Sequence, residues 1–256
     1  MGLFDLFASR EERERNALRR LSQKVTQKYG PPENRQKVIQ QLAQMGTPAA
    51  LKVLCLRFTV RADVGLHDDD EKEEARRILV EAGAASVAPV KEFLQEQESG
   101  VAWGLRILSA LVPPEEVLAT VVQLLVKLGR EYARDPEKKL VLLSWLSEHP
   151  DLLATATAGP PATVEAALLP LLEDFVDDVR IGAARVLARL PASEAAREAL
   201  LQLLIRDADN ARVRGEVLQA LCDLGAGAKG YRPKVEALLV EPFFLDREGR
   251  VKRRGV

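Results

Sequence analysis

Two stretches of sequence decide the fold: DDVRIGAARVLARL at residues 177–190 and NARVRGEVLQALCDLG at residues 210–225. In both, a charged or polar turn leads into Val-Arg or Val-x-x-x-Val-Leu patterns whose apolar residues recur at helical spacing. Arg180 and Arg214 occupy the same place in the two copies, 34 residues apart. A further apolar helix is predicted between them, at about residues 193–206. A two-helix unit that repeats at this period is typical of an α-solenoid.

The rest of the chain follows the same plan with less regularity. The second helix of each predicted pair ends near residues 46, 83, 112, 149, 190 and 225, mostly at glycine or proline. The intervals of about 30 to 41 residues bracket the known periods of helical-pair repeats. We therefore predict an all-α superhelix of about six helical pairs, with an N-terminal cap helix and a partial C-terminal unit.

A single solenoid over residues 1–256 is the expected domain organisation, because a solenoid grows by stacking and needs no central core. The Pro- and Gly-rich residues 150–161 could form a joint within it. Arg250-Val251-Lys252 resembles residues 212–214, so a further unit is expected to begin there and stop. The expected parts are a cap helix (1–30), degenerate repeats (31–149), well-formed repeats (161–225) and a C-terminal cap (226–256).

Composition limits the function. Lys and Arg number 37 and Asp and Glu number 38, so the net charge of −1 argues against a protein that grips long nucleic acid. Cys55 and Cys222 are too few for a disulfide framework. No apolar run is long enough for a transmembrane helix, and no secretory signal is present. These features favour a cytoplasmic protein.

Two polar segments have more than one interpretation. The acidic run at residues 68–74 suits the first turn of a helix, where acids face the positive end of the helix dipole, although it could also contact a basic partner. It lacks the glycine and the ligand order of a calcium loop. The apolar residues 1–7 are expected either to cap the first helix or to act as a docking peptide.

The two well-formed copies resemble the HEAT repeat, most clearly over residues 163–225. That resemblance implies a right-handed superhelix whose second helices line the inner surface. It also implies a polar ladder, in which the acid of a turn pairs with the arginine of a helix between neighbouring repeats. The residues expected in the ladder are Asp178 with Arg180, and Asp207 or Asp209 with Arg214.

No pattern of catalytic or metal-binding residues stands out. His67 and His149 are the only histidines and lie apart from both cysteines, and no P-loop or nucleophile elbow is present. We therefore predict no catalytic residue, no cofactor and no metal site, and expect the chain not to be an enzyme. Bilin lyases and alkylpurine DNA glycosylases resemble this architecture, so an enzyme of such a type is kept as an alternative.

Binding residues are sought on helix faces that the core does not use. Trp103 and Arg106 share a stripe apart from the apolar face of their helix, and Trp and Arg are common interface anchors. Arg185 and Arg189 lie one turn apart opposite the core set, and Gln219 matches Arg185 in the next unit. For each, packing between repeats or a solvated face is the competing interpretation.

The sequence thus favours a non-catalytic scaffold or adaptor that binds a protein partner on its concave row of helices. The alternative from another class is binding of nucleic acid or another anionic surface through the basic chain ends. Residues 10–28 carry seven basic and three acidic side chains, and residues 250–254 add four basic ones.

Overall fold

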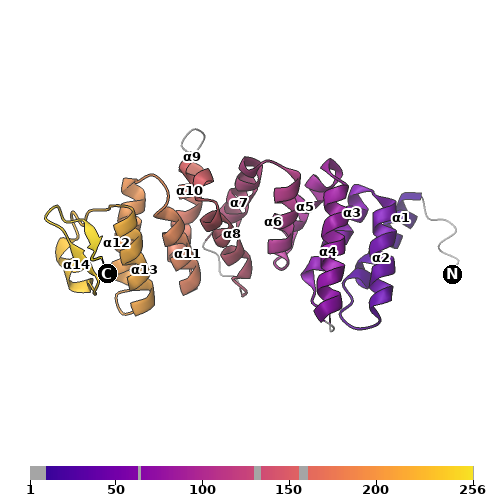
Figure 1. Cartoon of the computed structure of the whole chain (residues 1–256), viewed down its shortest axis with the longest axis horizontal. Helices are drawn as coiled ribbons and strands as arrows, with labels where there is room; N and C mark the ends of the chain where they lie inside the picture. Colours follow the sequence, from indigo (N-terminus) through magenta and orange to yellow (C-terminus); the bar gives the residue numbers. More distant parts are fainter. Residues whose placement is uncertain (1–9, 63–64, 130–133, 156–160, 256) are drawn as a thin grey trace. The chain divides into compact units, whose positions relative to one another are not determined.

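The computed structural model describes residues 10–62, 65–129, 134–155 and 161–255 of the chain. It divides into two compact units, residues 1–117 and 118–256, hereafter unit 1 and unit 2. Within each unit, helix follows helix in chain order (Figure 1). The predicted all-α helical-repeat fold is confirmed. Residues 1–7 and much of the expected joint lie outside the described residues, so these two predictions stay predictions.

Unit 1 is built from antiparallel helical pairs. Helix α7 (Pro114–Leu128) contains the division between the units, which falls after residue 117. The other helices of unit 1 are α1 (Arg10–Val25), α2 (Pro32–Met45), α3 (Pro48–Cys55), the 3-10 helix η2 (Leu56–Thr59), α4 (Gly65–Glu81), α5 (Ala84–Glu96) and α6 (Val101–Leu111).

Unit 2 continues the repeats and ends in a small hairpin. In unit 2 the chain changes from α-helix to 3-10 helix next to Pro170. Its elements are α8 (Glu137–Glu148), α9 (Pro150–Thr155), α10 (Pro161–Leu168), η4 (Leu169–Glu173), α11 (Asp177–Leu187), α12 (Glu194–Arg206), α13 (Ala211–Asp223), α14 (Arg232–Leu238), β1 (Phe243–Leu245) and β2 (Val251–Arg253).

Local capping explains why the helix ends agree with the sequence. The side chains of Thr47, Ser193 and Asn210 accept hydrogen bonds from backbone N–H groups in the first turns of α3, α12 and α13. Gly46 follows α2 in the left-handed conformation, with φ of 57°. The second helix of each pair ends one to three residues before the predicted position. These helices are α2, α4, α6, α8, α11 and α13.

The second helices of each unit pack against one another in sequence. In unit 1, α2 contacts α4 and α4 contacts α6, and in unit 2, α8 contacts α11 and α11 contacts α13. Leu, Val and Ala side chains fill the spaces between them. At Gly182 a Cβ atom would lie only 3.0 Å from Cδ1 of Leu143, so the glycine allows α11 to approach α8 closely.

A network of charged side chains is buried in unit 1. Glu71 accepts hydrogen bonds from Arg35 at 2.9 and 3.0 Å and from Nε of Arg57 at 2.9 Å. Arg57 also reaches Asp68 at 2.5 Å, and Lys72 donates to Asp68 at 2.7 Å. These five residues are at most 9% exposed. Opposite charges and full hydrogen bonding offset the cost of removing them from water.

This network corrects the interpretation of the acidic run. Asp68 lies in the first turn of α4, as expected. However, Asp68 and Glu71 point into the unit and bind arginines from α2 and η2, while Asp69 and Asp70 are exposed. The run thus combines two buried ion-pair partners with exposed acids, because only one side of α4 faces its neighbours.

Asp68 is expected to make unit 1 sensitive to acid. Burial raises the pKa of Asp68, but hydrogen bonds from Lys72, the Ala62 N–H and Arg57 outweigh this and hold it below the ordinary value. A carboxylate with a lowered pKa in the folded state stabilises the fold above its unfolded pKa of about 3.9 and loses that contribution as pH falls through the folded pKa. The free energy of unfolding should therefore fall below about pH 4.

Urea titrations at pH 7, 4 and 3 measure this effect. Asp68→Asn should be less stable than the parent at pH 7 and lose less stability between pH 4 and pH 3. Asp70→Asn, on an exposed neighbour in the same helix, is the control and should follow the parent. Equal loss of stability in the parent and in Asp68→Asn would contradict the role of Asp68.

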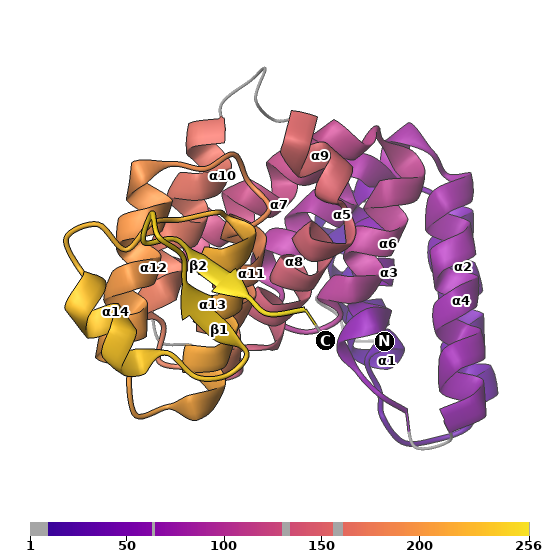
Figure 2. The same ribbon diagram turned by 60° about the vertical axis from the view of Figure 1, so that its left-hand side comes forward.

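The C-terminal end differs from the expected start of a further helical unit. Residues 251–253 form β2, antiparallel to β1 with Leu245 opposite Val251. Asp246 closes the turn, since its side chain accepts from the Arg250 N–H at 2.8 Å, and Gly249 supplies a φ of 77°. Strand β2 packs against α13 (Figure 2), and its Val251 is buried. A strand forms there instead of a helix, because a valine between basic residues also suits a strand.

No helix in the described part of the chain is long and apolar enough to cross a membrane.

Candidate binding groove

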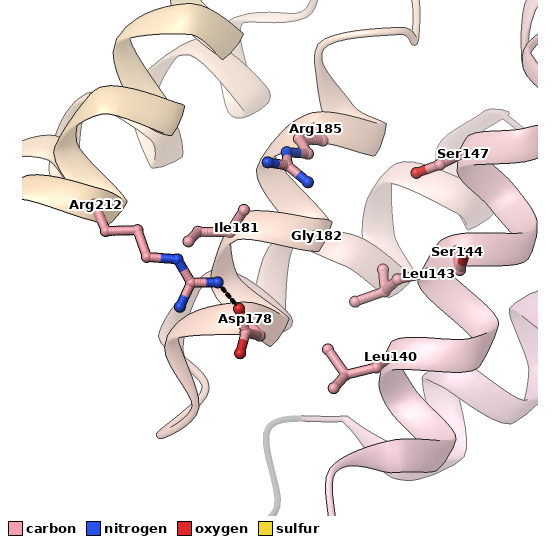
Figure 3. A pocket seen from close by; sticks show the side chains of 9 residues that line it. All are labelled: Leu140, Leu143, Ser144, Ser147, Asp178, Ile181, Gly182, Arg185 and Arg212. Atoms are coloured by element: carbon pink, nitrogen blue, oxygen red, sulfur yellow. Dashed lines mark hydrogen bonds and ion pairs between the residues drawn. The ribbon is translucent and has the colours of Figure 1, made fainter.

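A groove of about 330 Å³ lies between the second helices of unit 2, and we call it the α8–α11 groove (Figure 3). Buried apolar side chains form its floor and polar side chains its rim. α8 contributes Leu140, Leu143, Ser144 and Ser147, α11 contributes Asp178, Ile181, Gly182 and Arg185, and α13 contributes Arg212.

Two arginines on the groove are oriented by acids from the neighbouring repeat. Arg185 donates from Nε and Nη2 to the carboxylate of Glu216, at 2.8 and 2.7 Å. Arg212 donates to Asp178 across the same two helices (Figure 3). The side chains of both arginines are more than half exposed, 56% and 61%. Each pair therefore joins consecutive repeats and remains open to solvent.

Both arginines keep donors for a ligand. Among the described residues, none accepts a hydrogen bond from Nη1 of Arg185 or from Nε and Nη1 of Arg212. The hydrogen bond with Glu216 raises the pKa of Arg185, and in turn Arg185 lowers the pKa of Glu216. The groove thus presents two arginine–acid ion pairs, each with unused arginine donors, at its rim beside an apolar floor.

Arg189 and Gln219 lie on the same row of helices. Nη1 of Arg189 donates to the backbone oxygen of Ser147, one of the lining residues. Gln219 donates to Asp223 at 2.7 Å and accepts from Arg253 of β2 at 3.1 Å. The structure therefore places Arg185 in the lining of the groove and Arg189 beside it through Ser147, with Gln219 further along on α13.

The polar ladder has different rungs from those expected. Arg180 pairs with Asp177 at 2.6 Å and with Asp207 of the following turn at 2.8 Å, and not with Asp178. Asp178 instead binds Arg212. Arg214 donates to the backbone oxygen of Ala208 at 2.8 Å and forms no salt bridge with Asp207 or Asp209. Arg180 thus pairs with an acid of the following repeat, whereas Asp178 binds Arg212 at the rim of the groove.

A rung that the sequence did not indicate lies at the start of unit 2. Nζ of Lys139 is 2.6 Å from Asp174, and both side chains are buried. Asp174 also accepts from the Val176 N–H at 2.9 Å and offers its backbone oxygen to Arg180 at 2.6 Å. Lys139 occupies, one repeat earlier, the position that Arg180 has in α11. A basic residue that recurs at the repeat period was therefore the sequence signal that could have identified this rung.

Comparison with known proteins identifies the repeats. Residues 165–253 match the family model for HEAT repeats. This segment of the chain therefore contains HEAT repeats. The match covers α11 and α13, which carry both arginine–acid pairs of the groove, and it extends the resemblance seen at residues 163–225 to the C-terminal hairpin. No curated protein matches the sequence.

One solved structure corrects the expectation that the chain is not an enzyme. Human deoxyhypusine hydroxylase in complex with glycerol matches with 20% identity, over 89% of this chain and 91% of that chain, at a TM-score of 0.28. That protein is an enzyme, so the predicted absence of enzymatic function is not upheld. At this identity and TM-score, the hydroxylase activity belongs to the human protein and is not assigned to this chain.

Trp103 and Arg106 belong to α6 of unit 1, whereas the α8–α11 groove belongs to unit 2. Trp103 is half-buried and stacks on Phe58, with ring centroids 5.4 Å apart and planes at 17°. Arg106 lies 5.5 Å from the centroid of the Trp103 ring and 3.5 Å from Glu73. Trp103 therefore contributes to packing, and the exposed part of this cluster is Arg106.

The remaining reactive side chains are mostly packed within the repeats. The His149 ring stacks on buried Trp145, with centroids 4.1 Å apart. Burial raises the pKa of the Cys55 thiol to about 12, so that thiol stays protonated. In the described ranges, no group of three His, Cys, Asp or Glu side chains is arranged to hold a metal ion.

The basic C-terminal end is partly engaged with its surroundings. Arg250 pairs with Glu248 at 3.0 Å, Arg253 donates to Gln219, and Arg254 lies 5.7 Å from the centre of the Phe244 ring. These contacts spread the arginines around the hairpin. They do not gather them into one basic stripe of the kind that follows a nucleic-acid backbone.

Proposed function

We propose that this chain binds a segment of a partner protein along the α8–α11 groove of its HEAT repeats. The observation that carries the proposal is the pair of exposed arginines, Arg185 and Arg212, each oriented by an acid of the adjacent repeat and each with donors left over. Arginine held in a fixed geometry loses less side-chain entropy on binding and is a frequent interface anchor.

The groove suits an extended protein segment. Its floor, with buried Leu143 and Ile181, can receive an apolar side chain, and the arginines can donate to carbonyl or carboxylate oxygens of the partner. Ser144 and Ser147 add hydroxyl groups on the α8 side. Because exposed ion pairs contribute only about 0–1 kcal/mol, a partner carboxylate can replace Glu216 or Asp178 at small cost.

Site-specific photo-crosslinking tests the proposal. A benzophenone amino acid at Ser144 should give a discrete adduct with one protein in extracts of the source organism. The same group at Gln202, an exposed residue of α12 outside the groove, should not give it. Arg185→Ala/Arg212→Ala should weaken binding of that protein about tenfold or more, measured by titration calorimetry with the purified partner.

A matched control separates the groove from general charge effects. Arg77 and Arg232 are also exposed and paired with acids one helical turn away, at Glu81 and Glu236. Arg77→Ala/Arg232→Ala should therefore leave binding unchanged. Equal loss in both double variants would contradict the groove assignment. A complex with nucleic acid that dissociates steeply with rising salt would favour the basic ends instead.

A further inference from the structure

Helix α1 of unit 1 carries an exposed basic surface. Its Leu21 and Val25 are buried, and the helix packs against α2, α3 and η2. At about 100° of rotation per residue, five basic side chains fall outside this buried stripe and form two rows along the helix. All five are exposed, and we call them the basic face: Arg13, Arg20 and Lys24 in one row, Arg15 and Arg19 in the other.

The charge of the basic face is not neutralised by the part of the chain that the structure describes. None of its five side chains forms an ion pair with a described residue, whereas exposed arginines elsewhere, such as Arg77 and Arg212, are paired with acids. Uncharged Asn16 and Gln23 lie between the two rows, together with one acid, Glu12. One side of a single helix therefore has five positive charges and one negative charge.

An apolar segment precedes the basic face in the sequence. Residues 2–7 read Gly-Leu-Phe-Asp-Leu-Phe, with four large apolar side chains and one acid. The segment lies outside the described residues and is known by its sequence. Phenylalanine and leucine combined with clustered arginine and lysine are typical of segments that lie at the surface of an anionic membrane.

We propose that α1 and residues 2–7 bind the surface of an anionic lipid bilayer. The basic face lies toward the lipid phosphates, and Leu3, Phe4, Leu6 and Phe7 enter the boundary between headgroups and acyl chains. Guanidinium and ammonium groups donate to phosphate oxygens, and each basic residue near an anionic surface strengthens binding about fivefold. The packing of α1 within unit 1 is kept, because the buried stripe takes no part in the contact.

The apolar segment favours a lipid surface over nucleic acid. Leu3 and Leu6 have no counterpart in a nucleic-acid strand, whose bases stack on aromatic side chains. At a bilayer, leucine and phenylalanine side chains both leave water, which is favourable. The balanced charge of the whole chain, with 37 basic and 38 acidic residues, also argues against a nucleic-acid partner.

Co-sedimentation of the full chain with sucrose-loaded vesicles measures this binding. Vesicles of phosphatidylcholine with about 30% phosphatidylglycerol should bind half of the protein at about 1–100 µM accessible lipid, and rising salt should weaken the binding. Vesicles of phosphatidylcholine alone should bind it about 100-fold more weakly. A chain that stays in the supernatant up to about 1 mM anionic lipid would overturn the inference.

A charge variant tests the basic face. Arg13→Gln/Arg20→Gln/Lys24→Gln should weaken vesicle binding about 100-fold and keep the circular dichroism of the parent, since glutamine suits an exposed helix position. The matched control removes the same charge from three exposed residues of unit 2 that form no ion pair with a described residue: Lys127→Gln, Lys234→Gln and Arg247→Gln. If the face variant loses no more binding than this control, the inference fails.

The variant Phe4→Ser/Phe7→Ser tests the apolar segment. It should weaken vesicle binding about tenfold or more and leave the melting temperature unchanged, because the two rings lose their place in the lipid. If residues 2–7 instead cap α1, the variant should lower the melting temperature and leave vesicle binding unchanged. That result would contradict the proposed insertion.

Fluorescence anisotropy with a labelled single-stranded RNA separates the two anionic partners. At matched ionic strength the parent should bind the RNA more weakly than the anionic vesicles, and Phe4→Ser/Phe7→Ser should not change that weak binding. RNA binding by a chain that leaves the vesicles unbound would overturn the inference in favour of nucleic acid.

Discussion

Replacing Glu71 with glutamine is expected to lower the free energy of unfolding of unit 1 by about 3–5 kcal/mol. Glu71 is fully buried and is the shared acceptor of Arg35 and Arg57, which are themselves buried. Glutamine keeps the size of the side chain but not its charge, so two guanidinium groups would remain in the interior with less compensation. Breaking a buried ion pair costs more than the intact pair contributes, since it leaves a charge unpaired.

Urea denaturation followed by circular dichroism measures the loss. Glu81→Gln is the matched control, because Glu81 lies on the same helix and is 62% exposed in its pair with Arg77. Its substitution should change stability by less than about 0.5 kcal/mol. Similar effects of the two substitutions would show that the network contributes no more than a surface pair. Because the acceptor is shared by α2 and η2, we expect loss of structure across several helices of unit 1.

Replacing Gly100 with alanine is expected to destabilise unit 1 by about 2–5 kcal/mol. Gly100 has φ of 76°, and a Cβ atom there would lie 2.6 Å from the backbone oxygen of Phe58. The substitution therefore combines the strain of a left-handed residue with a clash against backbone, which cannot move aside as a flexible side chain would. At this chain length the melting temperature should fall by about 2–4 °C for each kcal/mol lost.

Gly46 provides the control that separates the two causes. It also has a left-handed conformation, with φ of 57°, but a Cβ atom there would lie 3.7 Å from the backbone oxygen of Ala43, an ordinary contact distance. Gly46→Ala should cost only about 1–2 kcal/mol. If both alanine variants lose the same stability, the contact with Phe58 is not a constraint. Gly100 begins α6, so its variant should also displace Trp103 from its stack on Phe58.

The groove proposal depends on the same repeat construction as these stability effects. Arg185 with Glu216 and Arg212 with Asp178 each connect α11 to α13, so the groove is assembled by neighbours and not by one helix.

The sequence by itself determined the helical repeats and their ends. Apolar residues at helical spacing and caps such as Thr47, Ser193 and Asn210 act within a few residues, so local chemistry was enough to predict them. It also pointed to Arg185 and Arg189 as residues outside the core. The sequence could not determine whether the chain is an enzyme, because no local motif decides it.

Only the tertiary structure decided which charged groups meet. Arg180 pairs with Asp207 and not with Asp178, and Asp68 is buried while Asp69 is exposed, because the rotation of each helix against its neighbours determines the partner. The groove depends on the close approach of α8 and α11 that Gly182 permits. These contacts join residues about one repeat apart, and spacing along the chain does not specify the distance between side chains.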